Sequence, residues 1–364
     1  MSHNQPHEKS ELESLDPLPL EVEQITPEWF ASILKLPVTG MKIIKTIHGT
    51  ASKILCELSY SEELPADVAP RHVCVKGGFV AELRLLGLVS AYHREAEFYY
   101  HLAPLLNIRL PKCWYAGTTK DQGLVVLEDL IAANNTFGST IEAWPVERVS
   151  AGLEQLAILH GTTSGPNPLE KYPWAVPHIS AIVLNMVSEV EWNKRFAPEA
   201  APPVPESQIN RRRIEAAFKT LWKQTPILTT FIHGDCHSGN TYLNSKGEPG
   251  FIDWQGPHVG SALHDVAYFL VGALTIEDRR ANERALLSHY LETLHAAGGP
   301  KLLVEDVWTE YQYQNLHGFV WPLSGPLMQP KEIVDEMSRR HGAAIEDHRS
   351  LEILEGLPSY VGLE

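Results

Sequence analysis

The sequence predicts an α+β protein in which a small antiparallel sheet precedes a larger helical region. Between residues 41 and 130, apolar and polar side chains alternate in several short runs, which is the period of half-buried strands. After Leu130, apolar positions recur mostly at helical spacing. Strands followed by a run of helices are typical of the α+β class. The chain has 364 residues, 44% of them hydrophobic, which is enough to build one large or two ordinary domains.

The expected elements divide the chain into three parts. Residues 1–24 form an acidic tail rich in Glu, Pro and Ser, which we expect to be disordered because it lacks apolar periodicity. Residues 25–130 form the sheet-rich N-terminal lobe, and residues 131–364 form the helical C-terminal lobe. The expected strands are 41–48, 52–60, 72–76, 112–116 and 124–128; the expected helices are one that begins after Thr26, then 92–106, 146–163, 178–196, 207–224, 261–273, 278–297, 303–318 and 331–349, with a β-rich stretch at 230–254.

Charge and cysteine content limit the partners and the compartment. The formal net charge is −15; residues 1–28 hold seven acids against Lys9, a net of −6, so the remainder carries −9. An acidic body argues against nucleic acid or a membrane surface as the partner. The four cysteines lack metal-type spacing, and no apolar run approaches the length of a membrane span. The N-terminus is polar and acidic, so we do not expect it to be a signal peptide. We therefore expect a cytoplasmic protein with free thiols.

The densest polar signal is the stretch 231–240, FIHGDCHSGN, followed by FIDWQ at 251–255. Apolar strand sequence flanks both, so their polar groups are expected at strand ends beside a core. Asn240 follows Asp235 by five positions, and Asp253 comes thirteen positions later. Phosphoryl transfer needs one carboxylate to orient and deprotonate the acceptor hydroxyl, and oxygen ligands such as an amide and a second carboxylate for Mg²⁺. A lone His-Gly-Asp would indicate a capped turn, but the joint spacing favours a phosphotransfer site.

These motifs resemble the catalytic loop and metal-binding motif of the aminoglycoside phosphotransferase and choline kinase superfamily. The likeness extends roughly over residues 25–350 in element order and is greatest to the ecdysteroid-kinase-like branch, through LEDL at 127–130, IDWQ at 252–255 and DVAYFL at 265–270. The resemblance implies a bilobal protein-kinase-like fold with ATP, or alternatively GTP, and Mg²⁺ bound between the lobes.

The resemblance also implies roles for individual residues. Asp235 corresponds to the catalytic base, and Asn240 to a catalytic-loop residue that ligates the metal. Asp253 corresponds to the metal-binding aspartate. The positions that support the loop are His233, His237 and Asp265, of which His233 and Asp265 brace it.

An ion pair between Lys76 and Glu95 is expected in the N-terminal lobe. Lys76 ends a strand that resembles the kinase strand whose lysine contacts the nucleotide phosphates. In helix 92–106, Glu95 shares the apolar stripe of Phe98 and Leu102, where a carboxylate is costly unless it is paired. Glu97 projects from another face. We therefore pair Glu95 with Lys76, as kinases require.

Two further nucleotide contacts are expected from the resemblance. The turn before Ser52 contains a single glycine, so a plain hairpin and a phosphate-binding loop that uses the Ser52 hydroxyl are both open. The segment Glu128, Asp129 and Leu130 resembles the linker between lobes, whose backbone hydrogen-bonds adenine.

The predicted function is an ATP-dependent kinase that phosphorylates a hydroxyl of a small-molecule acceptor. A catalytically silent kinase-fold binding module is the alternative, followed by a metal-dependent hydrolase that uses His233, Asp235 and His237. Helix 178–196 and segment 310–328 are candidate walls for the acceptor, although ordinary packing is the preferred interpretation of each side chain in them: Glu189, Glu191, Trp192, Tyr311, Tyr313, His317 and Trp321.

Overall fold

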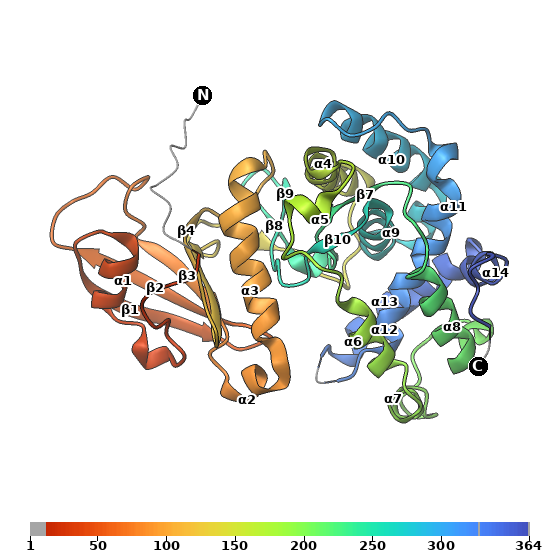
Figure 1. The fold of residues 1–364 in the computed structure, drawn as a ribbon, viewed down its shortest axis with the longest axis horizontal. Coiled ribbons are helices and arrows are strands. Elements are labelled where there is room, and N and C mark those ends of the chain that lie inside the picture. The colour runs from red at the N-terminus through yellow and green to blue at the C-terminus, as the bar shows by residue number, and fades with distance from the viewer. Residues whose placement is uncertain (1–11, 327, 363–364) are drawn as a thin grey trace. The chain divides into compact units, whose positions relative to one another are not determined.

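The computed structural model describes residues 12–326 and 328–362 and contains two compact units (Figure 1). The first unit comprises the described residues up to Leu106, together with Leu110–Thr136 and Ile252–Gly256. The second comprises Asn107–Arg109, Phe137–Phe251 and the described residues from Pro257 onward. One unit is built around a sheet and the other is mostly helical, so the predicted α+β class is confirmed.

The first unit holds an antiparallel sheet of five strands in the order β1-β2-β3-β5-β4. Each predicted strand of this region is present, with ends that differ by a few residues. Strand β3 lies in the middle of the sheet, so both of its edges are paired. The strands are β1 (Val38–Ile47), β2 (Ser52–Tyr60), β3 (His72–Gly77), β4 (Cys113–Thr119) and β5 (Gln122–Glu128).

The helices of the first unit follow local signals in the sequence. Helix α1 (Pro27–Leu34) begins where predicted, and Trp29 N donates to the Thr26 hydroxyl at 3.2 Å. The predicted helix 92–106 differs: after the short α2 (Ala81–Leu83) and a π-helical turn, α3 runs over Val89–Glu97, followed by a π-helical turn at Phe98–Leu102 and a 3₁₀ turn. Gly87, at φ 88°, separates the preceding turn from α3, and Pro104 cannot donate a helical hydrogen bond.

The prediction that residues 1–24 are disordered is wrong for residues 12–24. Thr118 N donates to Leu12 O and Ser14 N to Thr118 O, both at 2.8 Å, so this segment pairs with edge strand β4. Leu18 packs into the core of the sheet. The composition suggested disorder, but burial of a few apolar side chains and pairing with an open strand edge order the segment. Residues 1–11 lie outside the described part of the chain.

The second unit encloses helix α9 (Ala262–Ala273), all of whose residues are buried (Figure 1). Helices α4, α10, α11 and α13 pack against it. The predicted helices of this region are present, except that 178–196 is two helices; Ser188 is extended at ψ 153°, and acids in the following turn suit a new N-terminus. The helices are α4 (Val146–Thr163), α5 (Pro168–Lys171), α6 (Ile179–Met186), α7 (Glu189–Arg195), α8 (Arg211–Leu221), α10 (Ile276–Ala296), α11 (Val304–Gln314), α12 (Val320–Leu323), α13 (Lys331–Asp347) and α14 (Ser350–Glu355).

Short strands support the loops of the second unit. Strand β7 (Thr229–Ile232) pairs with β10 (His258–Ser261), and β8 (Thr241–Leu243) pairs with β9 (Pro249–Phe251). The predicted β-rich stretch therefore extends beyond residue 254 to include β10. A further short strand, β6 (Thr136–Phe137), lies at the division between the units.

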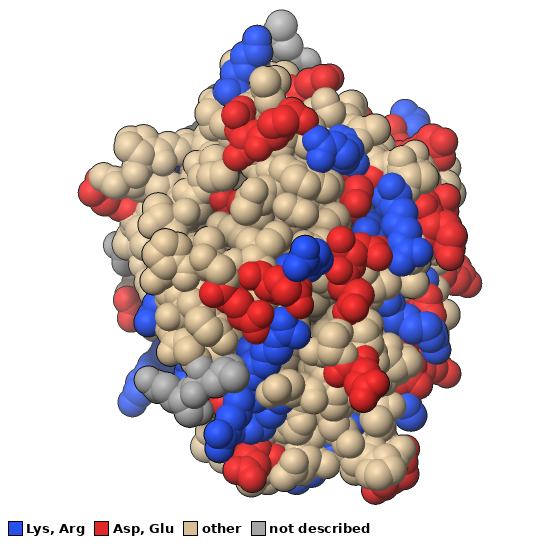
Figure 2. Space-filling model, turned by 90° about the vertical axis from the view of Figure 1, so that its right-hand side faces the viewer, with Lys and Arg blue, Asp and Glu red and all other residues tan. Residues whose placement is uncertain are grey.

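Figure 2 shows Lys and Arg side chains interspersed with Asp and Glu side chains on one face, beside a broad area of other residues. Ion pairs near the surface of the second unit include Arg284–Glu305 and Arg280–Asp347. Within the described ranges, no helix combines the length and the apolar character needed to cross a bilayer.

Candidate active site

Lys76 and Glu95 form a buried ion pair in the first unit. Lys76 Nζ lies 2.7 Å from Glu95 Oε1, and both side chains are 4% exposed. Strand β3 places the lysine in the middle of the sheet, and α3 presents Glu95 on the same apolar face as Phe98. Glu97 pairs instead with His101 at 3.1 Å. The prediction that Glu95, not Glu97, meets Lys76 is confirmed.

Asp253 supplies a second carboxylate to the same lysine. Its Oδ1 lies 2.8 Å from Lys76 Nζ. Burial alone would lower the pKa of Lys76, but the charges of Asp253 and Glu95 outweigh burial and raise this pKa above its usual value. Asp253 has a left-handed φ of 66°, a conformation that costs about 1–3 kcal/mol for a residue other than glycine. Such strain is found where the surrounding structure holds a functional group in place.

The segment Ile252–Gly256 is fixed to helix α3. Trp254 N donates to Glu95 Oε1 at 3.1 Å, and Arg94 Nε donates to Gln255 O at 2.9 Å. The Trp254 ring stacks on Phe98 with ring centroids 3.8 Å apart. From its place in the sequence, this segment is expected in the C-terminal lobe. These contacts explain why it packs as part of the first unit.

Ser52, whose hydroxyl is one of the predicted phosphate contacts, is buried in the structure. Ser52 begins β2, is 1% exposed, and has its Oγ 3.1 Å from His48 Nδ1. Tyr92, on α3, donates to Thr50 O at 2.7 Å. The turn is thus held by contacts from within the first unit, and Ser52 takes part in holding it.

The segment Glu128–Leu130 leads from the end of β5 into a turn. Glu128 N donates to Lys112 O at 2.8 Å, and Leu130 O accepts from Asn135 N at 2.9 Å, so these two backbone groups already have partners. The buried Asp129 carboxylate accepts from Ile131 N at 2.9 Å and from the following amide at 3.2 Å. The Asp129 side chain therefore stabilises the turn, a role that the sequence interpretation missed.

In the second unit, the catalytic-loop motif brings Asp235 and Asn240 together. Asn240 Nδ2 donates to Asp235 O at 3.0 Å and to Asp235 Oδ2 at 3.2 Å. Gly234 has a φ of 80°, which permits the sharp turn after β7. The Asp235 side chain is 52% exposed. The predicted pairing across five positions is confirmed as geometry, with a carboxylate that remains accessible to solvent.

Asp265 braces this loop from helix α9. It accepts from His233 N at 2.7 Å and from Gly234 N at 3.0 Å. Burial would raise the pKa of Asp265, but the hydrogen bond from His160 and the nearby histidines hold that pKa well below its usual value. The expected bracing by Asp265 is confirmed, whereas His233 takes part mainly through its backbone and through Nδ1, which accepts from Asp235 N at 3.3 Å.

His160 and Tyr290 extend the bracing network and were missed from the sequence. His160 Nε2 lies 3.2 Å from Asp265 Oδ2, and its Nδ1 lies 2.8 Å from the Tyr290 hydroxyl. His160 is fully buried on α4, four positions after Leu156 and seven after Leu153. A polar side chain on an apolar helical stripe is the signal that identified Glu95, and it was also present here.

A cluster of rings lies beside Asp235 in the second unit. His237 Nε2 is 3.8 Å from Asp235 Oδ2, and its ring is 5.2 Å from that of Trp321. Of the candidate residues for the acceptor walls, His317 and Trp321 belong to this cluster. Trp192 and Tyr311 are instead buried against other aromatic rings. Glu191 forms an ion pair with Lys194.

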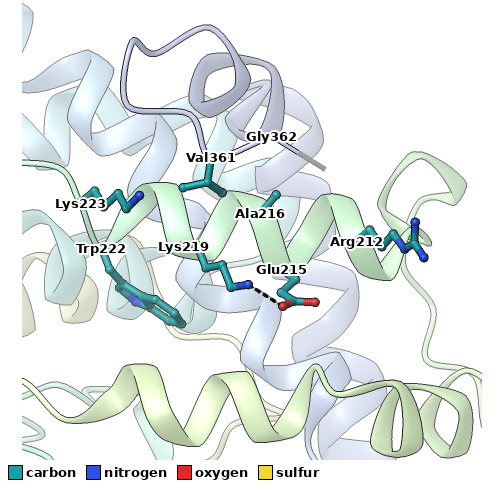
Figure 3. A pocket seen from close by; sticks show the side chains of 8 residues that line it. All are labelled: Arg212, Glu215, Ala216, Lys219, Trp222, Lys223, Val361 and Gly362. Atoms are coloured by element: carbon teal, nitrogen blue, oxygen red, sulfur yellow. Dashed lines mark ion pairs between the residues drawn. The ribbon is translucent and has the colours of Figure 1, made fainter. Parts of the chain in front are cut away.

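A pocket of about 260 Å³ lies along α8, apart from the predicted site residues (Figure 3). Lys219 points toward Glu215 there, with 2.8 Å between Nζ and Oε1. The lining residues are Arg212, Glu215, Ala216, Lys219, Trp222, Lys223, Val361 and Gly362. Across residues 12–326 and 328–362, no group of three or more His, Cys, Asp or Glu side chains is arranged to hold a metal ion.

Comparisons with known proteins identify related sequences and folds. Residues 176–302 match the family model described as "Phosphotransferase enzyme family". An ethanolamine kinase from Plasmodium vivax has a similar structure, with a TM-score of 0.50 at 14% identity, covering 85% of this chain and 83% of that one. A choline kinase from Streptococcus pneumoniae (TM-score 0.49, 13% identity, 90% and 99% covered) and a macrolide 2′-phosphotransferase from Brachybacterium faecium (TM-score 0.47, 14% identity, 85% and 97% covered) are also similar. No curated protein matches the chain.

The predicted resemblance to the aminoglycoside phosphotransferase and choline kinase superfamily is confirmed. The matched family model spans Asp235, Asn240, Asp253 and Asp265, and it supports the prediction of a phosphotransferase. The likeness to the ethanolamine kinase shows the protein-kinase-like fold. The closer likeness to the ecdysteroid-kinase-like branch stays a prediction.

Proposed function

We propose that this protein is a kinase that transfers the γ-phosphate of ATP to a hydroxyl of a small molecule. The observation that carries the proposal is the buried ammonium of Lys76 between the carboxylates of Glu95 and Asp253. One positive charge faces two negative ones, so this group as a whole favours a further cation. A metal that accompanies a nucleotide provides such a charge.

Each residue has a separate role in the proposal. Lys76, oriented by Glu95, contacts the phosphates of the nucleotide. Asn240 and Asp253 supply the amide and carboxylate oxygens that Mg²⁺ prefers, and the bound ion would neutralise charge that develops on the phosphates. In this proposal the first unit binds the nucleotide. That unit contains the turn with Ser52 and the backbone of Glu128–Leu130.

Asp235 handles the proton of the acceptor. Its carboxylate orients the acceptor hydroxyl and takes its proton as the oxygen attacks the γ-phosphorus; the bond from that phosphorus to the bridging oxygen breaks, and ADP leaves. Asp265 and His160 keep the loop in the required conformation through the amides of His233 and Gly234. Catalysis in such a site depends mainly on positioning and on electrostatic stabilisation.

A screen for nucleotide consumption tests the proposal. Wild-type protein is incubated with Mg²⁺, ATP or GTP, and a panel of amino alcohols, sugars, sterols and antibiotics, and release of the nucleoside diphosphate is measured. We expect one class of acceptor to accelerate release, and Asp235→Asn to abolish the acceleration. Magnesium-dependent nucleotide binding without turnover on any acceptor class, together with no effect of Asp235→Asn, would favour the binding module instead.

A further inference from the structure

Tyr268 lies beside the carboxylate that we propose as the base. Its hydroxyl donates to Asp235 Oδ1 at 3.4 Å, while Asn240 Nδ2 donates to the other oxygen, Oδ2, at 3.2 Å. The two carboxylate oxygens therefore have different donors, which restricts rotation of the carboxylate about its Cβ–Cγ bond. His237 also lies near Asp235, with its Nε2 3.8 Å from Oδ2.

Helix α9 and the surrounding rings hold Tyr268 in place. Tyr268 is 3% exposed and follows Asp265 by three positions, so both side chains lie on neighbouring parts of one helix face. Its ring centroid lies 4.9 Å from that of His317, 5.3 Å from that of His341 and 6.3 Å from that of Trp321. A ring packed in this way has little rotamer freedom, so the position of its hydroxyl is fixed before any substrate binds.

The phenol acts as a donor at neutral pH. Burial and the negative charge of Asp235 raise the pKa of Tyr268 well above its usual value, so the hydroxyl stays protonated. A donor that is already in place does not have to be ordered when the acceptor binds, which is the advantage of preorganisation.

We propose that Tyr268 is a positioning residue that fixes the orientation of the Asp235 carboxylate through Oδ1. Helix α9 would then fix the position of Asp235 in two ways. Asp265 holds the backbone of the loop, and Tyr268 holds the Asp235 carboxylate. The kinetic consequence of this inference rests on the proposed kinase function, whereas the interaction between Tyr268 and Asp235 does not.

A double-mutant cycle tests the interaction without any activity. Tyr268→Phe, Asp235→Ala and the double variant are unfolded with urea, and the midpoints are compared. We expect the two single shifts not to add in the double variant. The matched control is Tyr311→Phe, which removes another buried tyrosine hydroxyl that donates to a carboxylate, that of Glu283, at 3.3 Å. Its shift should add to that of Asp235→Ala. Additive shifts in both cycles would overturn the proposal.

A kinetic comparison then separates positioning from general packing. With magnesium ATP and the acceptor found in the screen, or water if none is found, Tyr268→Phe should lower kcat about tenfold and leave KM for ATP unchanged. Tyr311→Phe should change neither constant. Equal losses in the two variants, or a loss confined to KM, would contradict the role. Coupling in the urea cycle without turnover in the wild type would count against the kinase function and leave the contact established.

Discussion

Glu95 and Trp254 are joined by a 3.1 Å hydrogen bond from the tryptophan backbone N to the same carboxylate oxygen, Oε1, that binds Lys76. Glu95 therefore holds both the lysine and the segment that carries Asp253. Trp254 also stacks on Phe98, in the π-helical turn that follows α3. Helix α3 and this turn therefore set the position of a proposed metal ligand as well as that of the lysine that we propose to contact phosphate.

The first prediction follows from this double role. Glu95→Gln keeps the shape of the side chain but removes its charge, so we expect phosphotransfer to fall about tenfold to a hundredfold, the effect of weakening hydrogen bonds to a charged group. Glu97→Gln is the matched control, because Glu97 lies two positions away and pairs with His101. Steady-state kinetics should show a small effect for the control. Equal losses in the two variants would contradict the role of Glu95.

The second prediction concerns Asp265 and acid. The pKa of this carboxyl is lowered in the folded state, so its stabilising effect is complete above the unfolded pKa of about 3.9 and declines as the pH falls below that value. Asp265→Asn should lower the free energy of unfolding at pH 7 by about 2–4 kcal/mol, because buried amides lose a charged acceptor. Urea unfolding at pH 7 and pH 3 should show a smaller difference between the proteins at pH 3. A constant difference would contradict the argument.

The third prediction concerns the buried imidazole of His341. Burial, and then the charge of Arg340, lower its pKa from 6.5 to about 3. Between pH 6.5 and about pH 3, His341 therefore binds a proton in the unfolded chain but not in the folded protein. The free energy of unfolding declines as the pH falls through this range, by up to about 1.4 kcal/mol per pH unit. His341→Gln should flatten this decline relative to the wild type. Equal slopes in the two proteins would contradict the prediction.

Helical periodicity, together with the resemblance of the Lys76 strand to a kinase strand, was sufficient to predict the Lys76–Glu95 pair. The stripe formed by Glu95, Phe98 and Leu102 fixed the helical phase, although α3 begins at Val89 and the helix widens after Glu97. The predicted helical phase is still correct, because Glu95 near the end of α3 and Phe98 at the start of the π-helical turn are both buried. The strands of the first unit and the motif spacing were likewise accessible, because each depends on local pattern.

Contacts between distant parts of the chain were not accessible in the same way. The segment around Trp254 packs with the first unit although it follows β9 in sequence. The contact of Tyr268 with Asp235 could not be predicted either, because Tyr268 lies in a helix that is apolar along most of its length. The burial of His160 could have been predicted, since its position on the apolar stripe of α4 indicates a side chain that needs a buried partner. The order of residues 12–24 depends on an open edge at β4, which composition cannot reveal.

The measurement that tests the account most directly is magnesium-dependent binding of ATP to two matched variants, Asp253→Asn and Asp235→Asn. Asparagine tolerates the left-handed backbone at position 253, so each substitution removes one charge with little change in shape. Calorimetry with a thermal-shift control should show that Asp253→Asn loses the magnesium-dependent part of ATP binding, whereas Asp235→Asn binds nearly as the wild type does but does not turn over. Loss of ATP binding in Asp235→Asn, with unchanged magnesium dependence in Asp253→Asn, would contradict the assignment of the two aspartates.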